Sequence, residues 1–211
     1  MRILMAPMVD VAKPIILASG SSARRAMLTQ AGVGFTIEPA RIDETAIRDE
    51  FLRRVPLATP PEIALMLAGA KARDVSMRNG GALVIGSDQI LNIDATILTK
   101  PVDRAAAAAT LQHLRGRQHQ LHSAAAIAID GAIVWSTVDT ANLTMRRFSD
   151  EFLEQYLDAE GDSLWEVVGA FKLEGRGLQL FERIEGDYFT ILGMPLLPVL
   201  TELRVQGAIS S

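Results

Sequence analysis

The stretch IILASGSSARRAML, residues 15–28, predicts a strand, a tight turn and a helix in direct succession. Its first four residues are apolar, which is typical of a short buried strand. The small residues at 19–22 favour a turn, and the helical pattern starts at Ala23, with Gly32 as the expected C-cap. A helix that begins directly after such a turn presents unpaired N–H groups and a partial positive charge, which favour phosphate binding.

The same turn contains polar groups that suit a phosphate ligand. Ser19 and Ser21 contribute hydroxyls, and Arg24 and Arg25 contribute positive charge. The stretch lacks the G-x-x-x-x-G-K-[ST] spacing, so it is not a Walker loop. A capped surface helix with solvated arginines would explain the same residues, and the local sequence leaves both interpretations open.

Outward from this unit, the chain alternates between helix and strand patterns. We expect helices at 47–55, 59–77, 103–114, 149–158 and 196–204, a hairpin at 89–98, and strands at 35–39, 83–88, 119–129, 133–148, 170–173 and 178–184. Crossover and hairpin connections together predict an α/β (α+β mixed) protein with a mixed sheet. No repeat or low-complexity linker divides the chain, so we expect a single domain over residues 1–211, with residues 1–13 as a loose leader.

Composition and charge exclude several classes of protein. Hydrophobic residues make up 49% and charged residues 22% of the chain, which excludes a mostly disordered protein. The absence of cysteine excludes disulfides, thiolate metal sites and thiol nucleophiles. A net charge of −4 without a basic stripe argues against a nucleic-acid partner, and the apolar runs are too short to cross a bilayer. The N-terminus lacks a signal-peptide pattern. We therefore expect a soluble, cytoplasmic protein with no membrane partner.

One aspartate and two of the four lysines are candidates for chemistry. Asp88 ends the predicted strand at 83–88, at the edge where open α/β sheets place ligand-binding residues, and it could activate water or hold a divalent cation. A turn aspartate that caps its own backbone is the alternative. Lys71 extends the apolar stripe of its helix, where an ammonium group either snorkels or meets an anion. Lys100 lies in a loop soon afterwards, and a solvated surface position explains it equally well.

Two further sets of polar residues bear on a metal site. Asp43 and Glu44 form a carboxylate pair in a polar loop, which suits Mg²⁺ or simple exposure to solvent. His113, His119 and His122 lack the spacing of metal ligands, and we interpret His119 and His122 as structural or surface residues.

Taken together and in order, these segments resemble the Maf-like family of nucleoside triphosphate pyrophosphatases. The resemblance extends from Ile16 to about Leu203, nearly the whole chain. The matching motifs are Ile16–Ser21 with Arg24-Arg25, Asp43-Glu44, Ala70-Lys71-Ala72, Gly86-Ser87-Asp88-Gln89, Lys100-Pro101, Leu114–His119, Gly186-Asp187-Tyr188 and Leu192–Leu196. One such motif would be weak evidence, whereas the ordered set is specific.

The resemblance implies a two-lobed Maf/ITPase-like fold on an elongated mixed sheet, with the nucleotide in a central cleft. It implies hydrolysis between the α- and β-phosphates to give a nucleoside monophosphate and pyrophosphate. Asp88 would act as the general base or metal-linked activator of water, and Glu44 with Asp88 would support a divalent cation such as Mg²⁺ or Mn²⁺. The residues implied to hold the phosphates are Ser19, Ser21, Arg24, Lys71 and Lys100.

The resemblance also bears on the choice of nucleotide. Gln89 and Glu174 are similar to the branch that cleaves 7-methyl-GTP, whereas the dTTP/UTP branch has threonine and glutamine there. A glutamate suits guanine because its oxygens can accept hydrogen bonds from N1–H and the exocyclic amine. Ala23, after Ser22, is a departure at a specificity position, since the family usually has proline and a large or basic residue there. Thr99 and Arg115 depart from the family's usual glycine and serine.

Three functions therefore stand as hypotheses. The first is a pyrophosphatase for 7-methyl-GTP or another modified nucleotide, and the second is a dTTP/UTP pyrophosphatase. The third is a non-catalytic nucleotide-binding regulator of cell division, which would not need the carboxylate of Asp88. The oligomeric state is open, with a homodimer as one alternative.

Overall fold

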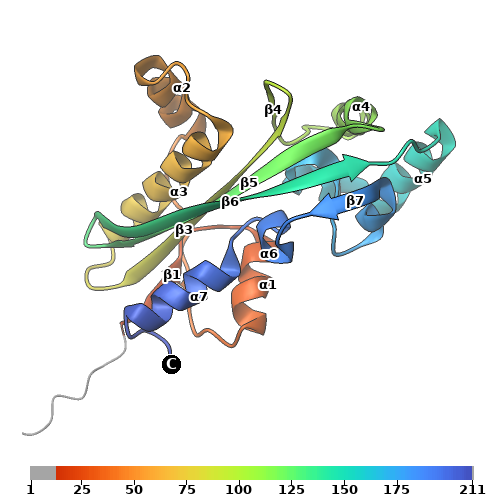
Figure 1. The fold of residues 1–211 in the computed structure, drawn as a ribbon. Helices are drawn as coiled ribbons and strands as arrows, with labels where there is room; N and C mark the ends of the chain where they lie inside the picture. Colours follow the sequence, from red (N-terminus) through yellow and green to blue (C-terminus); the bar gives the residue numbers. More distant parts are fainter. Residues whose placement is uncertain (1–12, 211) are drawn as a thin grey trace, which may run out of the picture.

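A long, twisted seven-stranded sheet forms the centre of the molecule (Figure 1). The computed structural model describes residues 13–210, so most of the leader predicted for residues 1–13 lies outside the described residues. The strand order is β2-β1-β3-β5-β6-β7, and β4 pairs with β3 outside this path. β1 is parallel to β2 and β3, whereas the other pairs are antiparallel. The prediction of a mixed α/β protein is confirmed.

The strands are β1 Ile15–Leu17, β2 Thr36–Ile37, β3 Leu83–Ile93, β4 Thr96–Leu98, β5 Gln118–Ile129, β6 Ala132–Met145 and β7 Phe181–Glu185. The α-helices are α1 Ser22–Gln30, α2 Glu44–Arg54, α3 Pro60–Ser76, α4 Arg104–Leu114, α5 Asp150–Glu160, α6 Tyr188–Ile191 and α7 Leu196–Val205. Three 3₁₀ segments complete the order: η1 Gly161–Glu166, η2 Val168–Ala170 and η3 Arg176–Leu180. Among the residues described, no helix combines the length and apolar character needed to cross a membrane.

Helices cover both faces of the sheet, and the buried side chains form separate clusters at its two ends. At one end, α3 packs on one face through Ile63, Leu67 and Ala72. On the opposite face, α1 and α7 bury apolar side chains against β1, β3 and β5. At the other end, α4 and α5 pack with β7 and the 3₁₀ segments. The long strands β3, β5 and β6 connect the two ends (Figure 1).

Asp88 lies in the middle of β3, which corrects the prediction that a strand ends there. β3 continues to Ile93 and pairs with β5 from Val84 to Asn92. The polar Ser87-Asp88 pair suggested a strand end, but the apolar pattern resumes at once with Ile90 and Leu91, which are both buried. The sheet accommodates the buried carboxylate because it has partners there, as described below.

Gly86 allows α3 to approach β3 unusually closely beside this carboxylate. A Cβ atom at Gly86 would clash with the main-chain oxygen of Ala68 and the main-chain nitrogen of Ala72. The absence of a side chain therefore brings the two backbones together at the level of Lys71, and this approach sets the site.

The strands predicted at 170–173 and 178–184 are wrong in part. Residues 168–170 and 176–180 are 3₁₀ segments, and the strand begins only at Phe181. Gly169, at φ 83°, and Ala170, at φ 56°, adopt left-handed backbone conformations that a strand cannot contain. The helix predicted at 47–55 begins earlier, at Glu44, because the Asp43 side chain accepts a hydrogen bond from the N–H of Ala46 and caps it.

Candidate functional site

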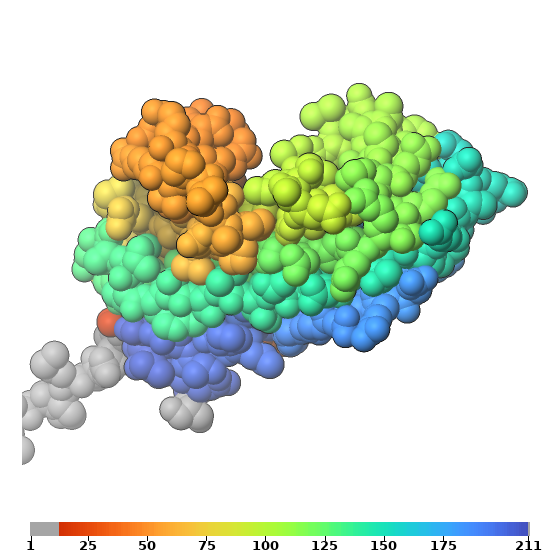
Figure 2. Space-filling model, turned by 45° about the horizontal axis from the view of Figure 1, so that its top comes forward, coloured from red at the N-terminus to blue at the C-terminus, as the bar shows by residue number. Residues whose placement is uncertain are grey.

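One cavity of about 830 Å³ is lined by most of the residues that the sequence singled out for chemistry. It is lined from one side by the start of α1, by α2 and by α3, and from the other by residues after β4 and between η1 and η3. In the space-filling view, the surface is hollowed between the part around α2 and the part around β4 and α4 (Figure 2). The predicted residues that line it are Ser19, Ser21, Ala23, Arg24, Glu44, Lys71, Asp88, Gln89, Lys100 and Glu174.

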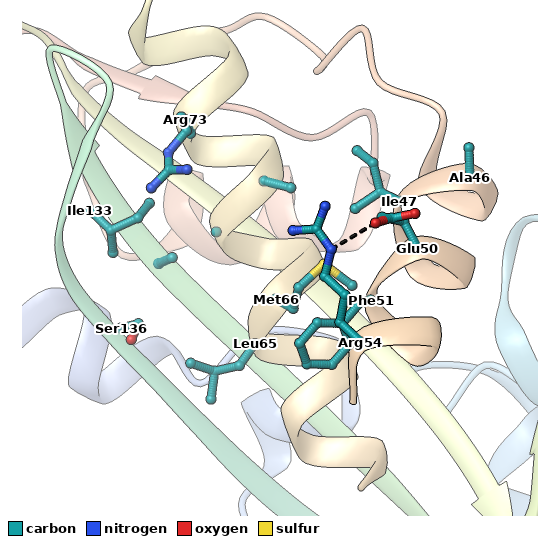
Figure 3. A pocket seen from close by; sticks show the side chains of 13 residues that line it. Ala46, Ile47, Glu50, Phe51, Arg54, Leu65, Met66, Arg73, Ile133 and Ser136 are labelled. Atoms are coloured by element: carbon teal, nitrogen blue, oxygen red, sulfur yellow. Dashed lines mark hydrogen bonds and ion pairs between the residues drawn. The ribbon is translucent and has the colours of Figure 1, made fainter. Parts of the chain in front are cut away.

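A second cavity, of about 690 Å³, lies on the opposite side of α2 and has a different character. Figure 3 shows Phe51, Leu65, Met66 and Ile133 around it, with Arg54 paired to a carboxylate on its own helix. None of the predicted site residues lines this apolar cavity. We therefore assign the chemistry to the larger cavity, which we call the cleft.

Lys71 contacts two acidic residues of the cleft, Asp88 and Glu44. Its ammonium lies 2.7 Å from Asp88 Oδ1 and 2.9 Å from Glu44 Oε2. Lys71 and Asp88 are both buried, at 8% and 7% exposure, while Glu44 is half exposed. The apolar stripe of α3 explains why the lysine points inward, and the two carboxylates are the anions that it meets. Burial raises the pKa of Asp88, although Lys71 and Arg24 act in the opposite sense.

Arg24 joins three segments that are far apart in the sequence. Its Nε–H donates to the carbonyl of Gly193 at 2.8 Å, and Nη1 donates to the carbonyl of Ser87 at 2.9 Å and to Ser19 Oγ at 3.2 Å. Burial lowers the pKa of this guanidinium, while the charges of Asp88 and Glu44 raise it. The hydrogen bonds of the described residues use Nε and Nη1, so Nη2 is left for a ligand.

The opening turn is built around its serines. Ser21 Oγ accepts from the N–H of Arg24 at 3.4 Å and caps α1, and Ser19 Oγ accepts from the N–H of Ser21 at 3.2 Å. Gly20 lines the cleft, and a Cβ added there would meet nothing within 4 Å, so the turn is open at this residue. The N–H groups of Ser22 and Ala23, the first two of α1, have no hydrogen-bond partner among residues 13–210 and are available to an anion.

Gln89 is held in one orientation by the C-terminal part of the chain. Its Nε2 lies within hydrogen-bonding distance of Ser123 Oγ at 3.0 Å, the Ile191 carbonyl at 3.0 Å and the Thr190 carbonyl at 3.2 Å. These acceptors engage the amide nitrogen, whereas the amide oxygen of Gln89 has no hydrogen-bond partner among residues 13–210. Glu174 lines the same cleft and is exposed in it.

Sequence reasoning missed three charged residues that line the cleft: Arg48, Glu166 and Lys172. Arg48 lies four residues after Glu44, a spacing that places two side chains on one face of a helix, so this signal was present in the sequence. Asp43, in contrast, caps α2 and does not line the cleft.

Asp88 and Glu44 fit a divalent cation only as partial ligands. Among residues 13–210, no group of three or more histidine, aspartate or glutamate side chains converges as a metal site. Two carboxylates nevertheless converge on the ammonium of Lys71. Mg²⁺ in nucleotide enzymes commonly uses one or two carboxylates, with substrate phosphates and water completing its shell. The donor set thus fits a cation that arrives with the nucleotide.

Comparisons with known proteins identify the family of this chain. The family described as "Maf-like protein" matches residues 14–206. The chain is 49% identical over 198 residues to a "Nucleoside triphosphate pyrophosphatase" of Nitrobacter winogradskyi, covering 94% of this chain and 96% of that protein. It is 48% identical over 200 residues to a "7-methyl-GTP pyrophosphatase" of Rhizobium meliloti, covering 94% and 100%. The chain therefore belongs to the Maf-like family and is a nucleoside triphosphate pyrophosphatase, a hydrolase that acts on acid anhydrides.

Proposed function

We propose that this protein hydrolyses 7-methyl-GTP, or another modified guanine nucleotide, to the nucleoside monophosphate and pyrophosphate. The observation that supports this most directly is the convergence of Lys71, Asp88 and Glu44 in a cleft that also contains Gln89 and Glu174. Relatives at 46–48% identity that are named 7-methyl-GTP pyrophosphatase support the choice of base.

Asp88 is the general base in this proposal. Its carboxylate takes a proton from water while the water oxygen attacks the α-phosphorus. The bond from the α-phosphorus to the bridging oxygen breaks, and its electron pair leaves with pyrophosphate. A raised pKa suits a base of this kind, because the carboxylate then binds the proton more firmly as the attack proceeds.

The phosphates are held by positive charge and by N–H groups, since phosphoryl transfer needs positioning and charge stabilisation more than covalent chemistry. Ser19, Ser21 and the N-terminus of α1 bind one side, and Arg24 Nη2, Lys71 and Lys100 supply the charge. A Mg²⁺ or Mn²⁺ ion held by Glu44 and Asp88 would neutralise further charge on the phosphate oxygens. The intact carboxylate of Asp88 favours this enzyme over a non-catalytic nucleotide-binding regulator.

The base lies between Gln89 and Glu174 in this proposal. Both present oxygens, which accept hydrogen bonds from the N1–H and amino group of guanine. Uracil and thymine each have a single N–H donor on this edge, so a dTTP/UTP preference is the weaker alternative. The small side chain of Ala23 leaves the wall of the cleft open near the opening turn.

We further propose a single domain whose two ends act as two lobes around the nucleotide. We also propose a cytoplasmic location, where nucleoside triphosphates are made and used.

We propose that two copies of the chain form a homodimer through the first part of β6. β7 pairs only with Asn142–Met145, so the outer edge of β6 before Asn142 has no strand beside it among the described residues, and such edges favour pairing with a second strand.

A nucleotide panel tests the proposed function. Pyrophosphate release should be measured for 7-methyl-GTP, GTP, dTTP and UTP with Mg²⁺ or Mn²⁺, and with excess chelator. We expect 7-methyl-GTP to be preferred, a monophosphate and pyrophosphate as products, and no turnover with chelator. Asp88→Asn, which is nearly isosteric, should reduce turnover at least about a hundredfold. A diphosphate and orthophosphate as products would refute the proposed bond, and a leading dTTP rate would refute the proposed base.

A further inference from the structure

The innermost charges of the cleft cancel one another. Lys71 and Arg24 contribute two positive charges, and Asp88 and Glu44 contribute two negative charges. All these positive groups already have protein partners: Lys71 contacts both carboxylates, and Arg24 donates to Gly193, Ser87 and Ser19. A nucleoside triphosphate is a polyanion, so further positive charge must come from outside this inner cluster.

Three other cationic side chains line the cleft: Arg48, Lys100 and Lys172. Lys172 lies on the side that also bears Glu166 and Glu174, so its charge is balanced near the proposed base. Lys100 is already among the proposed phosphate ligands. Arg48 is the remaining one of these three cations, and it has no role in the proposed reaction.

Arg48 lines the cleft one helical turn from Glu44. It follows Glu44 by one turn of α2, so the two side chains lie on the same face, about 6 Å apart along the helix axis. The Arg48 side chain is only 29% exposed, and its ion-pair contact is with the neighbouring Asp49 at 3.4 Å, which is a weak pair. Its guanidinium is therefore held at the cleft wall without a strong partner.

The two faces of α2 confirm which way Arg48 points. Ala46, Ile47 and Phe51 line the apolar cavity on one side of the helix (Figure 3). Glu44, Thr45 and Arg48 line the cleft on the other. One face of α2 therefore carries charged side chains to the cleft, and the other carries apolar side chains to the cavity that it shares with α3.

We infer that Arg48 binds the β- and γ-phosphates and stabilises the departing pyrophosphate. This rests on the proposed placement of the α-phosphate beside Asp88. Arg48 lines the same cleft one helical turn from Glu44, and its guanidinium offers the two outer phosphates a planar pair of donors that matches phosphate oxygens. Charge on the leaving group grows as the bond breaks, so this contact strengthens in the transition state.

Calorimetric titration with inorganic pyrophosphate in the presence of Mn²⁺ tests the inference without relying on turnover. The variants are Arg48→Gln and, as a matched control, Arg53→Gln, which removes the same charge from a 73% exposed position on the same helix. We expect Arg48→Gln to weaken pyrophosphate binding at least about tenfold and Arg53→Gln to leave it unchanged. Arg48→Lys should retain part of the affinity. The nucleoside monophosphate, which lacks the outer phosphates, should bind wild type and Arg48→Gln equally.

Equal pyrophosphate binding by wild type and Arg48→Gln would overturn the inference. A parallel loss of monophosphate affinity in Arg48→Gln would also overturn it, because the residue would then act on the α-phosphate or on the fold. If wild type turns over nucleotides but does not bind pyrophosphate, the placement of the phosphates fails together with the role of Arg48, while the enzyme activity stands.

Discussion

The ammonium of Lys71 lies 2.7 Å from Oδ1 of Asp88, and both side chains are buried. A buried ion pair of this kind contributes little to stability by itself, because desolvation of the two charges offsets most of their attraction. Burial raises the pKa of Asp88, and the ammonium of Lys71 acts against this rise because it stabilises the charged carboxylate.

Lys71→Met should therefore shift the pH dependence of the reaction. Without the ammonium, the pKa of Asp88 rises further, because burial then acts unopposed by its nearest positive charge. The base must be deprotonated, so the acid limb of the kcat/KM profile should move to higher pH, and activity at neutral pH should fall about a hundredfold. Lys71→Arg, which retains the charge, should keep the limb near its wild-type position. An unshifted limb in the methionine variant would show that another group is the base.

Gly86→Ala should damage stability and activity together. A Cβ at this position would clash with the backbone of α3 at Ala68 and Ala72, so α3 must move away from β3. We expect a loss of about 1–3 kcal/mol in the free energy of unfolding, as for other overpacked sites. Because α3 carries Lys71, turnover should fall even at temperatures where the variant remains folded. Gly34→Ala is the control, since its Cβ would meet nothing within 4 Å. Equal urea midpoints for both variants would contradict the proposed close contact.

Glu174→Gln tests how the base is recognised. The substitution places a donor where one acceptor oxygen faced the guanine edge, and a mismatch of this kind costs roughly 1–3 kcal/mol, or about five- to a hundredfold. We expect kcat/KM for 7-methyl-GTP and GTP to fall by that factor, and the values for UTP and dTTP to fall less or to rise. Glu182→Gln, at an exposed position on β7, should leave all four values unchanged. An unchanged ranking of nucleotides in the Glu174 variant would leave the pyrophosphatase activity standing and remove Glu174 from base recognition.

Because His119 is buried, we expect the free energy of unfolding to fall in mild acid. Its ring is 1% exposed and packs on Phe171 and Phe181, and neither ring nitrogen has a hydrogen-bond partner within the described part of the chain. Burial lowers the pKa of His119 from 6.5 to about 4, with a partial offset from the main chain of Arg117. The unfolded chain binds a proton below about pH 6.5 and the folded chain only below about pH 4. Stability therefore falls as the pH decreases through this window, by up to about 3 kcal/mol.

Urea unfolding at several pH values between 7 and 4 measures this effect. His119→Leu should flatten the pH dependence of the free energy of unfolding, whereas His113→Leu, on the exposed face of α4, should leave it as in wild type. A wild-type slope in the His119 variant would assign the acid sensitivity to other groups.

Sequence alone was sufficient for the features that depend on neighbouring residues. The strand, turn and helix of residues 15–28 form as expected, although α1 begins one residue earlier than predicted, at Ser22, where the Ser21 side chain caps it. Thr59 and Glu62 form the expected capping box of α3, and Asp130-Gly131 makes the turn between β5 and β6. These signals are local, because caps and turns satisfy main-chain groups within a few residues.

Family resemblance and spacing also selected the site residues, and all of them line one cleft, although their roles remain predictions. Sequence reasoning did not find Arg48, Glu166 or Lys172. Neighbouring residues do not indicate whether a charged side chain on an exposed segment faces a cleft or open solvent. The sequence analysis also placed Asp88 at the end of a strand, because a polar pair after an apolar run usually indicates that a strand ends.

Only the tertiary structure decided how these residues meet. Glu44, Lys71 and Asp88 come from α2, α3 and β3, and they converge because Gly86 lets α3 lie directly on the sheet. Arg24 reaches Gly193 across most of the chain, and Gln89 is oriented by carbonyls of α6. Such contacts depend on the packing of distant segments, and burial raises the pKa of Asp88, a shift that no pattern of neighbouring residues determines.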